Sequence, residues 1–165
     1  GPIGLLAVLV ARAAGASVVA TDIAAFTLDM AKRVGADAAL NAAQADALAP
    51  YTAHKGTFDV LFECSGVQSA LVSAIPALRP GAVIMQLGLG GDMTLPMQAI
   101  TAKEIELRGS FRFHAEFATA VRLMQSGRID VVPLITQTLP LDEAVRAFEL
   151  ASDRSQAVKA QIAFS

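Results

Sequence analysis

The first glycines of the chain have the spacing of a phosphate-binding loop. Gly1-Pro2-Ile3-Gly4 corresponds to the last four positions of a Gly-x-Gly-x-x-Gly motif. Glycine at 1 lets backbone approach a pyrophosphate, and glycine at 4 lets a helix pack closely on its strand. Pro2 suits the first turn of that helix, whose free N–H groups attract an anion. These residues predict a site for a phosphate-bearing ligand.

An acidic residue stands at the distance that a dinucleotide site needs. Asp22 follows the glycines by about 20 residues, the spacing at which a carboxylate accepts hydrogen bonds from an adenosine ribose. A carboxylate there repels a 2′-phosphate, so NAD is favoured over NADP, which remains possible as a cofactor. A tight strand-to-helix turn followed by an exposed Asp is the alternative interpretation.

The motif is incomplete, because the sequence contains neither its first glycine nor the strand that comes before it. We therefore expect the chain to be a piece of a larger protein. By itself it should bind a dinucleotide weakly at most and turn over no substrate, because the absent strand and glycine help to shape the pyrophosphate loop.

Alternating helix and strand patterns position these residues. The alternation, with short connections, predicts an α/β fold with a doubly wound parallel (Rossmann) sheet that lacks its first strand. Arg79-Pro80-Gly81 is a stop-and-turn signal, and the period-2 pattern at 104–111 predicts a half-exposed strand near the sheet edge. The expected helices are 5–14, 27–34, 67–78 and 116–126, and the other expected strands are 17–22, 38–40, 58–63 and 82–87.

Ligands of such sheets bind at the carboxyl ends of the strands. Asp22, Ser65-Gly66, Gly88-Leu89 and Phe111-Arg112 all follow predicted strands, so four loops should converge on one crevice. The strand 133–140, the helix 141–151 and the strand 157–164 have no evident place in that sheet. We place a boundary near Val132, with a cofactor domain at 1–132 and a separate C-terminal segment at 133–165.

Composition excludes several classes of function. The net charge of −2 comes without a basic cluster, so nucleic acid is not an expected partner, and no apolar run reaches the length of a membrane span. The single cysteine, Cys64, rules out an internal disulfide and fits a reducing cytoplasm. Cys64, His54 and His114 show no close pairing as metal ligands, so we expect no metal site here.

The motifs together resemble the zinc-dependent medium-chain alcohol dehydrogenases, and most closely their polyol dehydrogenase branch. The resemblance covers essentially the whole chain. Within that branch, residues 109–114 and 148–157 look most like those of enzymes that oxidise the sugar acid L-idonate. The matching segments are Gly1-Pro2-Ile3-Gly4, Thr21-Asp22, Ala31-Lys32, Gly35-Ala36-Asp37, Glu63-Cys64-Ser65-Gly66, Leu87-Gly88-Leu89-Gly90, Phe111-Arg112 and Pro133-Leu134-Ile135-Thr136.

The resemblance implies hydride transfer between a secondary alcohol of a sugar acid or polyol and NAD. It implies a catalytic zinc whose ligands lie in an N-terminal domain outside this sequence, and a C-terminal segment that belongs to the catalytic domain. It also implies a homo-oligomer, for which the strand at 104–111 is our candidate interface. Another polyol, such as sorbitol or xylitol, and threonine remain alternative substrates.

Site residues follow from the resemblance by position. Gly1, Pro2, Ile3 and Gly4 match the pyrophosphate loop and Asp22 the ribose ligand, while Ser65 and Gly66 belong to the converging loops. Leu87, Gly88 and Leu89 match the nicotinamide-side loop. Ser110, Phe111 and Arg112 match a segment that touches cofactor and substrate, and Arg112 and Phe113 face the substrate. Two departures are Thr27, where the branch often has arginine, and Phe113, where it has tyrosine.

Other interpretations remain open. A small thiol after a buried strand is more often packing than chemistry, so Cys64 has no assigned role. A nucleotide sensor without chemistry also uses such a loop, although the proline-bracketed C-terminal strand disfavours it. A methyltransferase shares the glycine loop and the acid, but its acidic or aromatic substrate motif is replaced here by Cys64-Ser65-Gly66.

Overall fold

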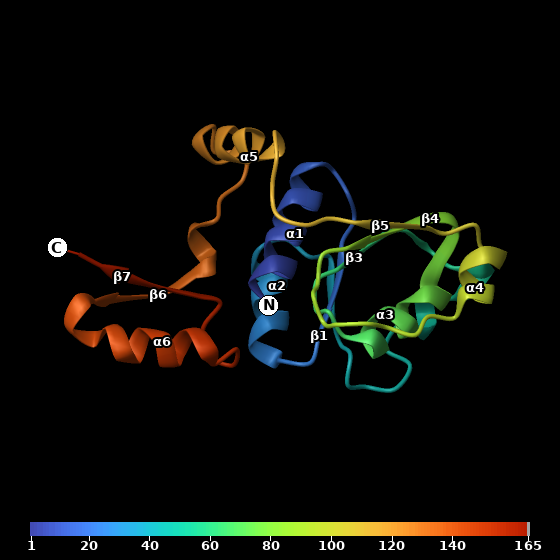
Figure 1. Ribbon diagram of the computed structural model, residues 1–165, viewed down its shortest axis with the longest axis horizontal. Helices are drawn as coiled ribbons and strands as arrows, with labels where there is room; N and C mark the ends of the chain where they lie inside the picture. Colours follow the sequence, from blue (N-terminus) through green and yellow to red (C-terminus); the bar gives the residue numbers. More distant parts are fainter. Residues whose placement is uncertain (165) are drawn as a thin grey trace. The chain divides into compact units, whose positions relative to one another are not determined.

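Helices and strands alternate along the chain, as the apolar pattern predicts (Figure 1). The structure is a computed structural model that describes residues 1–164. These residues form two compact units, one made of residues 1–43 with those from 113 onward and the other of residues 44–112. Each unit has its own apolar core.

The first unit begins with the predicted glycine-motif helix. Helix α1 (Pro2–Ala13) starts after Gly1, with Pro2 in its first turn, and ends before Gly15, whose φ of +87° suits glycine. Strand β1 (Val19–Asp22) pairs in parallel with β2 (Ala38–Asn41), and helix α2 (Ala25–Arg33) connects them. The buried residues of this core are Leu5, Val8, Met30, Ala31, Val34 and Leu134.

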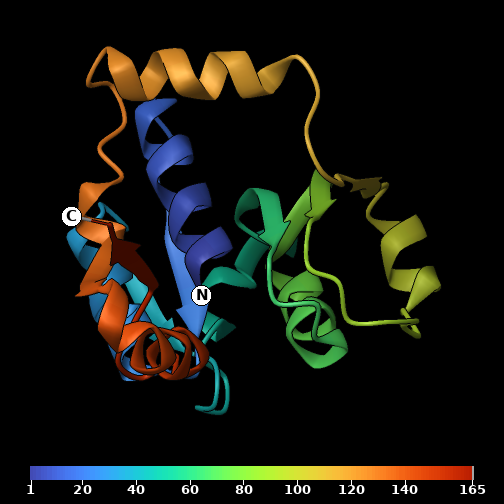
Figure 2. The ribbon, with the colours of Figure 1, turned by 60° about the vertical axis from the view of Figure 1, so that its left-hand side comes forward.

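The C-terminal half of the first unit is a second small α/β arrangement. Helix α5 (Glu116–Gln125) is followed by β6 (Ile135–Pro140), α6 (Ala144–Ser152) and β7 (Lys159–Ala163). Strands β6 and β7 pair in parallel in a sheet of their own, with α6 beside them (Figure 2). The expectation that this segment stands outside the main sheet is confirmed. The domain boundary at Val132 stays a prediction.

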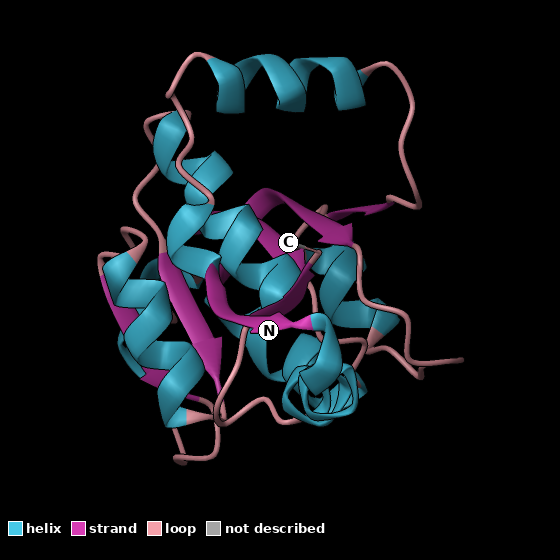
Figure 3. Ribbon diagram, turned by 90° about the vertical axis from the view of Figure 1, so that its left-hand side faces the viewer, coloured by secondary structure: helices cyan, strands magenta, loops and turns pink. Residues whose placement is uncertain are grey.

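The second unit contains a three-stranded parallel sheet in the order β3-β4-β5. Figure 3 distinguishes the helices from the strands by colour. Its elements are β3 (Phe58–Glu63), α3 (Gln68–Ala74), β4 (Leu78–Gln86), α4 (Met97–Ala102) and β5 (Glu106–Gly109). The pattern did not predict α4. The buried core of this unit contains Leu71, Ile75, Leu78, Ala82, Ile84, Ile100 and Ile105.

The parallel α/β class is confirmed, and the strand order explains why one expected sheet is seen as two. A dinucleotide-binding sheet has the order 3-2-1-4-5-6, and its first strand precedes the glycine motif. Without that strand, the remaining strands form two separate groups, with the orders 3-2 and 4-5-6. These orders match the observed two-stranded sheet β2-β1 and the three-stranded sheet β3-β4-β5.

Two local expectations were wrong. Arg79-Pro80-Gly81 does not form the expected turn between a helix and a strand at 82–87, because β4 begins at Leu78 and continues through these residues as a bulge: Phe58 faces Leu78, but Val60 faces Val83. Gly81 takes a φ of +74° there, which explains the glycine. Strand β5 is at the sheet edge as expected, but all four of its residues are exposed, so it does not alternate.

Among residues 1–164, no helix is long and apolar enough to cross a membrane.

Candidate functional site

Part of the predicted site lies in the first unit, where the start of α1 adjoins the end of β1. The nitrogen of Gly1 lies 3.1 Å from Asp22 Oδ2, and the Ala24 N–H donates to Oδ1 at 3.0 Å. The side chain of Asp22 is 24% exposed, so it is partly accessible to a ligand. The structure therefore brings Gly1, Pro2, Ile3 and Gly4 together with Asp22.

The residues of this first group fit the phosphate and ribose of a dinucleotide. The first intrahelical bond of α1 runs from the Leu5 N–H to the Gly1 carbonyl, at 3.1 Å, so the earlier N–H groups have no acceptor within the helix. A Cβ on Gly1 would meet nothing within 4 Å, so the approach to the backbone is open. A helix N-terminus attracts an anion, and an adjacent carboxylate accepts hydroxyl hydrogen bonds. Thr27, which stands where the polyol dehydrogenase branch often has arginine, is buried on α2.

The other part of the predicted site lies in the second unit, at the carboxyl ends of its three strands. Gly66 follows β3 and packs backbone against backbone with the loop after β4: a Cβ on Gly88 would overlap the Gly66 nitrogen, and one on Gly90 the Gly66 carbonyl. The Ser110 N–H, after β5, donates to the Gln86 carbonyl at 3.0 Å. Three loops thus converge here, which brings Ser65, Gly66, Leu87, Gly88, Leu89 and Ser110 together.

A buried carboxylate to which the sequence motifs assigned no role holds this second group. Glu63 is 4% exposed and accepts from the Ser65 N–H at 2.8 Å, the Gly66 N–H at 3.0 Å, the Ser65 hydroxyl and Gln86 Nε2 at 2.7 Å. Glu63 and Gln86 are register partners on β3 and β4. The available signal was that two adjacent apolar strands each end in a polar residue.

The predicted substrate residues lie at the surface. Arg112 takes a left-handed φ of +62°, and its guanidinium carbon lies 4.8 Å from the ring centre of Phe111. Phe113, which returns the chain to the first unit, is 65% exposed, and its ring lies 5.1 Å from that of Phe117. Leu89 is 79% exposed. These exposed side chains are accessible to a ligand, and their contact with a substrate stays a prediction.

Cys64 is half-buried beside Glu63. Burial, and then the charge of Glu63, raises the pKa of the thiol to about 11. The thiolate is the reactive form, so iodoacetamide should alkylate folded Cys64 on the order of 100-fold more slowly than a free cysteine at pH 8. Mass spectrometry across a pH series should show the rate rising until about pH 11. Rapid labelling at pH 8, with the unfolded chain as the reference, would contradict this.

No group of three or more His, Cys, Asp or Glu side chains within residues 1–164 is arranged to hold a metal ion. The donor set of the described residues therefore does not fit a catalytic zinc.

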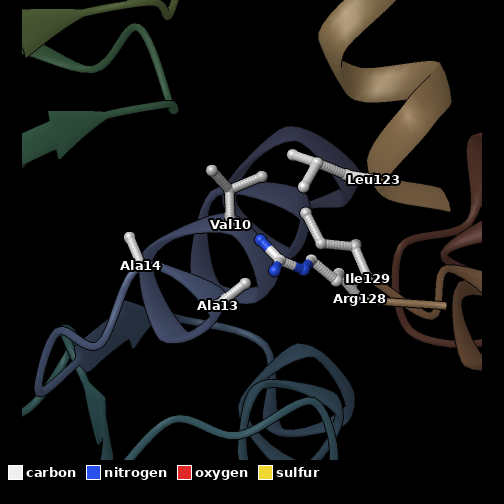
Figure 4. A pocket seen from close by; sticks show the side chains of 6 residues that line it. All are labelled: Val10, Ala13, Ala14, Leu123, Arg128 and Ile129. Atoms are coloured by element: carbon white, nitrogen blue, oxygen red, sulfur yellow. The ribbon is translucent and has the colours of Figure 1, made fainter. Parts of the chain in front are cut away.

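A separate hollow of about 430 Å³ lies at the other end of α1, between that helix and the residues around the end of α5 (Figure 4). Its lining is apolar except for Arg128, and it contains none of the predicted site residues. The lining residues are Val10, Ala13, Ala14, Leu123, Arg128 and Ile129.

Comparison with known proteins connects this geometry with one family. The family profile described as zinc-binding dehydrogenase matches residues 2–126. L-Idonate 5-dehydrogenase (NAD(P)(+)) of Escherichia coli K12 is 40% identical over 99% of this chain and 48% of its own length. Sorbitol dehydrogenase of Gallus gallus is 36% identical over 96% of the chain and 46% of its own length. The chain therefore spans about half the length of the curated relatives it matches.

Solved structures have the same fold. The crystal structure of the E. coli L-idonate 5-dehydrogenase has a TM-score of 0.92 over 99% of this chain and 48% of its own, with 39% identity. An E. coli alcohol dehydrogenase complexed with the cofactor NADH has a TM-score of 0.89 over 99% of this chain and 50% of its own, with 26% identity. The Rossmann-type dehydrogenase fold is thus confirmed.

Proposed function

We propose that this chain, which belongs to the zinc-binding dehydrogenase family, is the NAD-binding part of an oxidoreductase acting on a secondary alcohol of a sugar acid or polyol. The observation that carries this proposal is the placement of the Asp22 carboxylate beside the N-terminus of α1. An open helix start accommodates the pyrophosphate, and the carboxylate beside it accepts from the ribose. Oxidation of L-idonate to 5-ketogluconate is the favoured reaction, with sorbitol-type polyols or threonine as alternatives.

Each group of residues has a role in this proposal. Bound NAD supplies the hydride acceptor. The backbone of residues 1–4 and the dipole of α1 hold the pyrophosphate, and Asp22 orients the adenosine ribose. The loops at 65–66, 87–89 and 110–112 border the nicotinamide end. Arg112 offers a cation to the hydroxyls or the carboxylate of a sugar acid, and Phe113 offers an apolar face.

The catalytic zinc that the family implies belongs, in this proposal, to the part of a full-length family member that this chain does not cover. Since the chain spans about half the length of its curated relatives, we propose that turnover needs that other part and that the chain alone binds the dinucleotide without oxidising an alcohol. We further propose that the protein is cytoplasmic, with a small-molecule substrate as its ligand.

Calorimetric titration of the chain with NAD, NADP, ADP and S-adenosylmethionine tests the proposal. The expected result is binding of NAD, with a lower affinity for NADP because the 2′-phosphate meets Asp22. Equal affinity for ADP and NAD would favour a sensor of adenine nucleotides, and binding of S-adenosylmethionine alone would favour a methyltransferase. No binding of NAD would remove the proposed function.

We also propose that β5 pairs with β5 of a second copy in a homo-oligomer, because it is an exposed strand at a sheet edge. Leu107, which is 49% exposed, is the position to test. Leu107→Pro removes an N–H from the edge and should dissociate the oligomer in sedimentation velocity. Ile105 is unsuitable because it is 8% exposed in the core. An unchanged sedimentation profile for a folded variant would refute the pairing.

A further inference from the structure

We infer that Glu63 is a positioning residue that holds two loops in the conformation required by the nicotinamide ring of the dinucleotide. This inference rests on the proposed function. Glu63 follows a buried strand, is 4% exposed and lies under the loops rather than at the surface. It acts through Ser65 and Gly66 on one side and through Gln86 on the other.

Every polar group in contact with the Glu63 carboxylate is a hydrogen-bond donor. Oε1 accepts from the Ser65 N–H at 2.8 Å, from the Gly66 N–H at 3.1 Å and from the Ser65 hydroxyl. Oε2 accepts from the Gly66 N–H at 3.0 Å and from Gln86 Nε2 at 2.7 Å. A carboxylate satisfies this set because it only accepts, whereas an amide would direct its own N–H₂ group at a donor.

Gln86 extends the hold to the second loop. Its Nε2 donates to Glu63 and also to the Gly88 carbonyl at 2.8 Å, so both amide protons are used. Its Oε1 is buried with no hydrogen-bond partner among residues 1–164. The two hydrogen bonds donated by the amide nitrogen therefore fix the orientation of Gln86. The bond to the charged Glu63 carboxylate is the stronger of the two, because the other acceptor is the neutral Gly88 carbonyl.

The backbones of the two loops are in close contact. The places where Gly88 and Gly90 approach Gly66 leave no room for a Cβ. A shift of residues 64–66 that follows the loss of Glu63 must therefore shift residues 87–90, which include the predicted nicotinamide-side loop. In the group formed by Gly1–Gly4 and Asp22, the Asp22 carboxylate accepts from Gly1 and Ala24, and neither of these hydrogen bonds involves Glu63.

This separation allows the two ends of the ligand to be tested independently. ADP-ribose contains the adenosine, the pyrophosphate and the terminal ribose of NADH but no nicotinamide. In calorimetric titrations of the chain, Glu63→Gln should lower the affinity for NADH by about tenfold. The affinity for ADP-ribose should change by less than about twofold. The fluorescence of bound NADH, which reports the surroundings of the nicotinamide, should shift toward that of the free form. Glu149→Gln, the same change on an exposed residue of α6, is the matched control and should leave both ligands unchanged.

A second variant keeps the inference testable if Glu63→Gln does not fold. Gln86→Met preserves the length of the side chain, removes the donor to Glu63 and Gly88, and eliminates the buried unpaired oxygen. It should reproduce the selective loss of NADH affinity in a folded chain. Equal weakening of NADH and ADP-ribose in the folded variants, or no weakening of either, would overturn the inference and leave the proposed function standing. If the unmodified chain bound neither NADH nor ADP-ribose, both the proposed function and the inference would be refuted.

Discussion

Gly90→Ala is expected to lower the free energy of unfolding by about 3 kcal/mol or more and to abolish detectable NADH binding. A Cβ at this position would overlap the Gly66 carbonyl. Backbone cannot move aside as the end of a flexible side chain does, so the loops at 64–66 and 87–91 must separate. Chemical denaturation of the chain measures the first effect, and NADH titration measures the second.

Gly109→Ala is the matched control for this prediction. A Cβ on Gly109 meets nothing within 4 Å, and this glycine is not among the residues with positive φ. The substitution should change the stability by less than about 0.5 kcal/mol. If Gly90→Ala unfolds at the same denaturant concentration as Gly109→Ala, Gly90 is not in close backbone contact with Gly66.

Residues with a fixed spacing along the chain could be predicted from the sequence. The distance from the glycines to Asp22 depends only on one helix and one strand, so the pattern of apolar residues was enough to place them at one edge. The same holds for Ser65-Gly66 and Leu87-Gly88, which follow two strands that neighbour each other in the sheet. Strand ends are local features, and the parallel topology brings them together.

Features that depend on register could not be predicted. Glu63 and Gln86 became visible as a pair only when β3 and β4 were aligned, because 22 intervening residues separate them. The bulge that carries Arg79, Pro80 and Gly81 is a similar case. Proline and glycine mark an irregular backbone, but they do not say whether the strand resumes beyond it.

Exposure was the other unpredictable quantity. Alternation at 104–111 predicted one buried face, yet Leu107 is half-exposed beside three exposed neighbours. The pattern of apolar and polar residues in a strand reflects every surface that the strand contacts in the whole protein, including the surfaces of other subunits. An apolar side chain on an exposed edge is therefore consistent with the proposed pairing between subunits.

Asp22→Asn should lower the affinity for NAD by roughly 10- to 100-fold, because hydrogen bonds to a charged group are worth about 1.5–3 kcal/mol. The affinity for NADP should stay the same or rise, since the charge that repels a 2′-phosphate is gone. Asparagine keeps the oxygen that accepts from the Ala24 N–H at 3.0 Å, so the turn into α2 is preserved. Asp22→Ala loses that bond as well and should also destabilise the fold.

Calorimetric titration with both cofactors measures the ratio of the two affinities, which isolates the charge from any general loss of binding. Asp29→Asn removes the same charge from an exposed position on α2 and should leave the ratio unchanged. Because Asp22 contacts the start of α1 and the turn into α2, its substitution should weaken the binding of NADH and of ADP-ribose alike. An NAD-to-NADP ratio that does not respond to Asp22→Asn would show that another group recognises the ribose. Equal weakening of ADP-ribose and NADH by Asp22→Asn, set against selective weakening of NADH by Glu63→Gln, would assign the two ends of the dinucleotide to the two groups of residues.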